Sequence, residues 1–219
     1  MQVKTWLDRL TESKNVWFSA VRAEDEGHFD NAASYYLNDA LECIKQRSLV
    51  RAALSCSCAA NCLSMMGSIS QARTLYSEAA NIYVENSDIA MSESIREAMW
   101  SLQEAFENYV FANNLEAANA IRNRYLKLAT RTSAFFKAGE VEKELELRKA
   151  TAIDIMRKMT ASTVKKQEEP IPDKLTKEIE NLMRARSSRA DADKFDPVTV
   201  MKSLNPNGGS RLNGKSIVS

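Results

Sequence analysis

Two stretches of the chain, forty residues apart, carry the same short signature. The first runs Gly27-x-Phe29-x-x-Ala32-x-x-x-Tyr36 and the second runs Gly67-x-Ile69-x-x-Ala72-x-x-x-Tyr76. Glycine adopts the left-handed conformation that ends a helix, so each copy predicts a turn followed by a returning helix. In the returning helix an alanine lets two backbones approach closely, and the tyrosine four residues later lies on the same face. A signature that recurs at such a period is typical of helical repeat proteins.

The signature resembles the tetratricopeptide repeat. In the second copy Ala60 and Leu63 stand where that family places a small and a large packing residue before the turn, whereas the first copy departs from the second by having Asp39 in place of Ala79. A weaker third copy is Asn113-x-Leu115-x-x-Ala118, and a fourth turn is predicted at Gly139. The irregular spacing is more similar to the bundles of soluble NSF attachment proteins than to a regular array. The resemblance covers roughly residues 14–140 and implies an all-α fold, an antiparallel helix-pair solenoid.

Composition supports helices throughout the first part of the chain, because all four prolines lie beyond residue 169. The stretch before them is rich in residues with high helix propensity and shows no alternating strand pattern. It predicts about seven helices in one domain, residues 1–161, with approximate bounds 2–25, 29–47, 49–66, 69–86, 89–112, 115–137 and 140–161. The charge run from Glu140 to Lys149 in the last helix predicts a solvent-exposed face with i,i+4 ion pairs.

The remaining residues predict a tail in three parts. Residues 162–172 have the composition of a linker, residues 173–189 form a short amphipathic helix, and residues 190–219 are expected to be disordered. The short helix carries an apolar stripe that either folds back onto the protein or docks on a partner, and the polar tail contains one apolar cluster that is either a docking motif or without function. The candidate protein-binding residues of the tail are Leu175, Ile179, Leu182, Phe195 and Val198.

The sequence predicts no catalytic, cofactor-binding or metal-binding residues. The four cysteines stand among small and apolar residues, where free cysteine behaves as a packing residue, and a disulfide framework is not expected without a secretion signal. His28 is the only histidine and falls inside the first turn, and the acidic triplet Glu24-Asp25-Glu26 is expected to be a solvated helix end. Residues 52–72 carry no charge but are too polar to span a membrane, so we expect a cytoplasmic protein without a transmembrane segment.

These observations favour a non-catalytic adaptor or scaffold that binds a protein through its helical groove, its tail or both. In the first helices of the predicted pairs, Trp17, Asn61 and Trp100 are the groove candidates, although tryptophan is more often a core residue. An alternative is a nucleic-acid-associated protein that uses the basic tail, with Arg184, Arg186 and Arg189. The net charge of +1 is a weak footprint for that function, and the lack of an acid, base and nucleophile set makes an enzyme the least favoured alternative.

Overall fold

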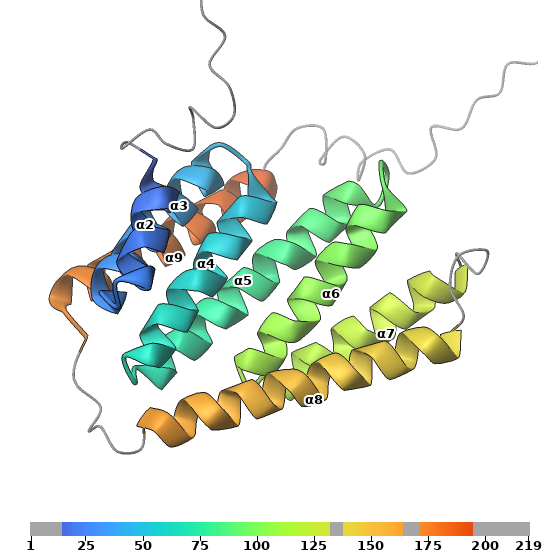
Figure 1. Cartoon of the computed structure of the whole chain (residues 1–219). Coiled ribbons are helices and arrows are strands. Elements are labelled where there is room, and N and C mark those ends of the chain that lie inside the picture. The colour runs from blue at the N-terminus through green and yellow to red at the C-terminus, as the bar shows by residue number, and fades with distance from the viewer. Residues whose placement is uncertain (1–14, 132–137, 164–170, 195–219) are drawn as a thin grey trace, which may run out of the picture. The chain divides into compact units, whose positions relative to one another are not determined.

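The computed structural model describes residues 15–131, 138–163 and 171–194, and all regular structure in these ranges is α-helical (Figure 1). This finding confirms the predicted all-α class. Seven helices are followed by a tail helix; they are α2 (Val16–Asp25), α3 (Phe29–Lys45), α4 (Leu49–Met65), α5 (Ile69–Ala90), α6 (Ile95–Phe111), α7 (Leu115–Arg131), α8 (Ala138–Thr163) and α9 (Asp173–Lys194). Within the described ranges no helix has the length and apolar character needed to cross a membrane.

Four of the helix connections share one backbone geometry. A single residue with positive φ stands at each of them, and these residues are Gly27 (77°), Arg47 (59°), Gly67 (90°) and Asn113 (59°). The N–H of the following residue donates to a carbonyl five residues earlier, as from Ser68 to Leu63 at 2.9 Å. This bond satisfies a carbonyl that the end of the helix would leave unpaired. The signature therefore located three of the four turns, and it missed Arg47 because arginine carries no preference for positive φ.

The fourth predicted turn was wrong, because Gly139 lies in the first turn of α8. The predicted boundary between the helices at 69–86 and 89–112 was also misplaced. Helix α5 continues to Ala90, and α6 starts only at Ile95, where the Ser94 hydroxyl accepts a hydrogen bond from the Glu97 N–H at 3.2 Å. Ser94-x-x-Glu97 has the form of a capping box, which is the signal that marks this start.

The ends of the predicted segments differ by smaller amounts. Helix α8 extends to Thr163, and α9 extends to Lys194 rather than to residue 189, so it includes part of the segment expected to be disordered. The predicted helix at 2–25 corresponds to α2, and its first part lies outside the described residues.

Each helix from α2 to α7 packs against the next helix along the chain, and α8 packs on α6, α7 and α4. Two aromatic contacts show that α5 and α6 are antiparallel, because Tyr76 stacks on Phe111 with ring centroids 5.2 Å apart and Tyr83 meets Trp100 edge-on at 5.7 Å. The alanines of the signature are buried, and so are its tyrosines. Small side chains at close helix approaches and large ones beside them thus account for the repeated pattern.

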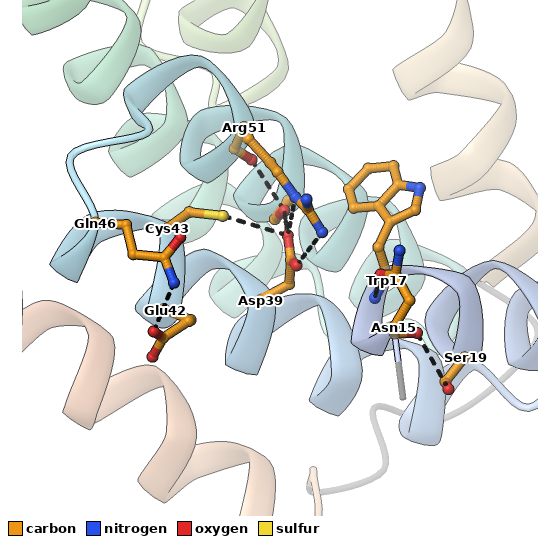
Figure 2. A network of polar contacts seen from close by, with 9 residues as sticks. Asn15, Trp17, Ser19, Asp39, Glu42, Cys43, Gln46 and Arg51 are labelled. Atoms are coloured by element: carbon orange, nitrogen blue, oxygen red, sulfur yellow. Dashed lines mark hydrogen bonds and ion pairs between the residues drawn. The ribbon is translucent and has the colours of Figure 1, made fainter. Parts of the chain in front are cut away.

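A buried carboxylate explains why the first copy of the signature departs from the second. Asp39 on α3 accepts hydrogen bonds from Arg51 on α4, Nη2 to Oδ1 at 2.6 Å and Nε to Oδ2 at 3.1 Å (Figure 2). The Ser55 hydroxyl donates to the same carboxylate at 2.6 Å, and the Cys43 thiol lies 3.7 Å from it. A bidentate pair of this kind fixes the geometry of two helices, because both nitrogens of the guanidinium must meet both oxygens. In the first copy, the polar contacts of Asp39 therefore take the place of the packing of Ala79 in the second copy.

Candidate protein-binding surface

The apolar stripe of the tail helix is largely covered. Leu175 and Leu182 are buried, and Ile179 is half-buried. Between the two leucines, Glu178 Oε1 accepts hydrogen bonds from the Ser34 hydroxyl at 2.9 Å and from Asn38 Nδ2 at 3.4 Å, both on α3. These contacts correspond to the alternative in which the segment folds back onto the protein. Phe195 and Val198 lie outside the described residues.

Trp17 is half-buried against the helices that follow it. Its half-buried ring meets Tyr36 on α3 edge-on, with centroids 5.0 Å apart, and the Arg51 guanidinium lies 6.0 Å from its centroid (Figure 2). Both partners belong to the following helices, so this side chain joins α2 to α3 and α4. A ring in such contacts acts as a packing residue, which is the alternative role for Trp17.

The same position has the same role in the next two repeats. Trp17, Ser57 and Gln103 each stand ten residues before the turn residue of their pair, Gly27, Gly67 and Asn113 respectively. The Ser57 hydroxyl donates to Asn108 Oδ1 on α6 at 2.7 Å, and Gln103 Nε2 donates to Glu144 Oε1 on α8 at 3.0 Å. We call α2, α4, α6 and α8 the first helices. This position therefore joins each first helix to the next one.

A second set of repeat-equivalent positions is exposed on α4 and exposed or half-buried on α6. Thirteen, six and two residues before the turn residue stand Leu54, Asn61 and Met65 on α4, and Trp100, Glu107 and Phe111 on α6. Residues spaced in this way lie on one face of a helix. Leu54 is 43%, Met65 48% and Trp100 40% exposed, and Phe18 on α2 is 40% exposed. We call these seven residues the first-helix stripe.

The other two groove candidates belong to this stripe. Asn61 is exposed, and its Oδ1 accepts a hydrogen bond from the Tyr76 hydroxyl at 2.5 Å. The Trp100 ring rests edge-on against Tyr83 while leaving part of its surface to solvent. Both side chains are thus held in place from behind by a tyrosine of α5. Asn61 and Trp100 thus leave more of their surface open to a partner than the half-buried Trp17 does.

Helix α8 runs alongside α6 in the same direction, because Gln103 bonds Glu144 and, one turn later on both helices, Glu107 pairs with Arg148. Between the two helices lies a pocket of about 390 Å³. Its apolar wall residues are Phe111, Leu147, Ala152 and Ile155, and its polar ones are Glu107, Glu144, Arg148 and Thr151. Leu147 is 68% exposed and Ile155 is 40% exposed, so the pocket opens directly to solvent along α8. We call it the α6–α8 pocket.

Carboxylates outnumber cations around this pocket. Arg148 binds both Glu107 and Glu144, the latter at 3.4 Å. Glu104, half-buried one turn before Glu107 on α6, has a raised pKa because burial disfavours its charge and because Glu107 repels it, while Arg148 acts in the opposite direction. Two carboxylates therefore share one guanidinium, and a third lies close enough to feel its charge.

The charged residues of α8 between Glu140 and Lys149 do more than form a solvent-exposed face. Besides the i,i+4 pair between Glu144 and Arg148, the run makes ion pairs across helices, from Arg148 to Glu107 on α6 and from Glu142 and Glu146 to Arg122 on α7. The predicted i,i+4 pairing accounts for part of the charge run. The ion pairs of the run with α6 and α7 depend on the tertiary structure. These pairs place Arg148 at the edge of the α6–α8 pocket.

The described residues show little that resembles a reactive centre. They contain no group of three or more histidine, cysteine, aspartate or glutamate residues placed to hold a metal ion. Burial raises the pKa of Cys58 to about 11 and that of Cys62 to about 12. A thiol with such a pKa is a poor nucleophile near neutral pH, because the thiolate is the reactive form.

Several residues of this surface were not predicted from the sequence. They are Phe18, Leu54, Met65, Glu107 and Phe111 of the stripe and Leu147 and Ile155 of the pocket. The signal that could have found those of α4 and α6 is their constant offset from the turn residues. Comparison of the chain with family models, with curated proteins and with solved structures gives no match.

Proposed function

We propose that the protein is a non-catalytic adaptor, with a tetratricopeptide-like helix-pair architecture in the style of soluble NSF attachment proteins. It binds a partner protein on the first-helix stripe and in the α6–α8 pocket. The observation that carries the proposal is that apolar side chains accessible to solvent recur at equivalent positions of α4 and α6, the exposed Leu54 with the exposed Trp100 and the exposed Met65 with the half-buried Phe111. We propose the cytoplasm as its location, in keeping with four cysteines that are all free thiols.

The regular positions of the accessible apolar residues support a binding function rather than a chance distribution. Single exposed apolar residues are normal on protein surfaces, and their positions follow no rule. Here the exposed Leu54 and Trp100 stand at one offset from the turn residue, and the exposed Met65 and the half-buried Phe111 at another. Hydrogen bonds from α4 to α6 and from α6 to α8 place these helices next to one another, so the exposed residues gather on neighbouring elements. Gathered apolar surface typically marks a protein-binding site.

A nucleic-acid partner remains the alternative function, but the charges described above do not favour it. Glu107 and Glu144 line the pocket beside the single arginine Arg148, and Glu104 lies three residues before Glu107 on α6. Phosphate groups would be repelled there, since nucleic-acid binding depends on neutralisation of phosphates by lysine and arginine. The tail arginines Arg184 and Arg186 are the residues through which this alternative would act.

The proposal is tested by affinity capture from an extract of the source cells, with the full chain as bait. Leu54→Asp with Met65→Asp places two charges on the stripe, and Ile89→Asp on α5 is the matched control, since Ile89 is 55% exposed and lies outside the stripe. We expect a protein that the wild type and the control retain but the stripe variant loses. Its purified form should then bind the wild type in calorimetry at least tenfold more tightly than the stripe variant. Equal retention by all three baits would contradict the proposal.

A further inference from the structure

We propose that the α6–α8 pocket receives an amphipathic helix of the partner protein, and that this helix carries a lysine or arginine beside its apolar anchors. The inference rests on the proposed function and adds the chemistry of the partner. It combines two independent features of the pocket, namely the shape of its apolar wall and the charge around it.

The wall of the pocket suits an extended partner better than a small molecule. Small-molecule sites enclose about 70–90% of the ligand surface. In this pocket Leu147 and Ile155 are themselves largely or partly exposed, so a small ligand would leave much of its own surface uncovered. Leu147, Thr151 and Ile155 follow one another at i, i+4 and i+8 along α8. They form a ridge that lines one side of the pocket and is about 12 Å long at the helical rise of 1.5 Å per residue.

A partner helix suits this ridge in length. Helices that bind in grooves present apolar anchors at i, i+3 or i+4 and i+7, which span about two turns, as does the ridge on α8 with Leu147 and Ile155 at its ends. Phe111 on α6 lies across the pocket and gives the anchors a second apolar wall. Trp100 stands on the same face of α6, eleven residues before Phe111, so a longer helix that follows α6 would reach it as well.

The charge around the pocket selects a basic helix. Arg148 is engaged by Glu107 and Glu144, and Glu104 lies half-buried three residues before Glu107 on α6. Two carboxylates thus pair with one cation, and a third stands one turn away on α6, which leaves a local excess of negative charge when all of them are ionised. A lysine or arginine of the partner beside Glu104 would offset this excess in a partly desolvated place, where charge pairs are stronger than in water. An acidic helix would instead add to the repulsion.

The experiment uses the purified full chain and two fluorescein-labelled helical peptides of sixteen residues. Both peptides have leucines at i, i+4, i+7 and i+11; one carries lysines at the flanking positions and the other carries glutamates. Fluorescence anisotropy measures the dissociation constants at low and high salt. We expect the lysine peptide to bind at least tenfold more tightly at low salt, and the preference to shrink at high salt because exposed charges are screened. Equal affinities, or no binding of the lysine peptide, would overturn the proposal.

Variants then assign the binding to the pocket. Leu147→Asp should weaken the lysine peptide at least tenfold, and Ile89→Asp on α5 should leave it unchanged. Glu104→Gln keeps the size of the side chain and should reduce the preference for lysine over glutamate several-fold. If Leu147→Asp has no effect, or if Glu104→Gln leaves the preference intact, the assigned site is wrong.

The two proposals fail in different ways. If the extract yields a partner that is lost from the stripe variant while the two peptides bind equally, the adaptor function stands and the basic helix does not. If the lysine peptide binds with the expected preference while no extract protein depends on the stripe, the pocket chemistry is right and the adaptor function is unsupported.

Discussion

Arg51 on α4 holds both carboxylate oxygens of Asp39 on α3, and the Asp39 side chain is only 7% exposed (Figure 2). The guanidinium also lies near the Trp17 ring on α2, so one side chain connects three successive helices. Its pKa is raised, chiefly by the hydrogen bonds with Asp39, so Arg51 stays charged at any pH at which the protein is folded. This residue therefore joins the first helix pair to the second.

Arg51→Met should lower the free energy of unfolding by about 2–4 kcal/mol, because it leaves a buried carboxylate with a serine as its main partner. Urea denaturation measures the change. Arg73→Met on α5, where the arginine is exposed, is the matched control and should cost less than about 0.5 kcal/mol. The double variant Asp39→Asn with Arg51→Met should be less destabilised than the sum of its single variants. Additive effects would show that the pair does not couple the two helices.

Ala72→Leu should destabilise the protein by about 1–3 kcal/mol through overpacking. Ala72 is buried at 1% exposure in the first turn of α5, where the added atoms have no free space. Ala120→Leu on α7 places the same side chain at an exposed helical position and serves as the control. Thermal melts of the two variants should separate by several degrees, and superimposable melts would show that Ala72 is not at a close helix contact.

Removal of the tail helix tests how firmly α9 is docked. A chain that ends at Ala161 should still unfold cooperatively, because α2 to α8 pack on one another without it. In the full chain, Leu182→Ala should cost about 2–3 kcal/mol, as expected for a buried leucine. Thr176→Ala, at an exposed position of the same helix, is the control. Equal urea midpoints for Leu182→Ala and Thr176→Ala would show that α9 does not dock in solution, and an unfolded truncated chain would show that it is part of the core.

The buried thiols should react slowly with Ellman's reagent at pH 8. Burial raises the pKa of Cys43 and of Cys58 to about 11, so only about one thiol in a thousand is ionised at that pH. In denaturant the same cysteines should react at the rate of a free thiol, at least a hundredfold faster. Mass spectrometry of partly modified protein identifies the sites. Rapid labelling of Cys43 in the native protein would contradict its burial.

Stability should decrease as the pH rises above about 8.5, where the cysteines of the unfolded chain begin to lose their protons. The folded state keeps the Cys62 thiol protonated, since burial raises its pKa to about 12. The unfolded state then binds fewer protons than the folded state, so the free energy of unfolding falls by up to about 1.4 kcal/mol per pH unit for each such thiol. Cys62→Ala should make the dependence between pH 9 and pH 11 less steep, as measured by urea denaturation at each pH. An unchanged slope would refute this assignment.

Local signals in the sequence were sufficient for the class of fold and for most helix ends. Gly27 and Gly67 mark their turns because the left-handed backbone costs glycine nothing, and Asn113 marks the third because asparagine tolerates it. The burial of Ala32 and Ala72 follows from their place relative to those turns. These features depend on a few neighbouring residues, so a single sequence contains them.

The binding surface depends on which helices are neighbours, and that was decided only by the tertiary structure. The sequence selected Trp17, but contacts with Tyr36 and Arg51 leave this ring half-buried, whereas the adjacent Phe18 is exposed. Leu175 and Leu182 formed a recognisable stripe, yet only the contacts of α9 show that they are buried. Leu147 and Phe111 became one pocket because α8 lies parallel to α6. The periodicity of a helix determines which of its faces is apolar; what covers that face depends on contacts between residues far apart in the chain.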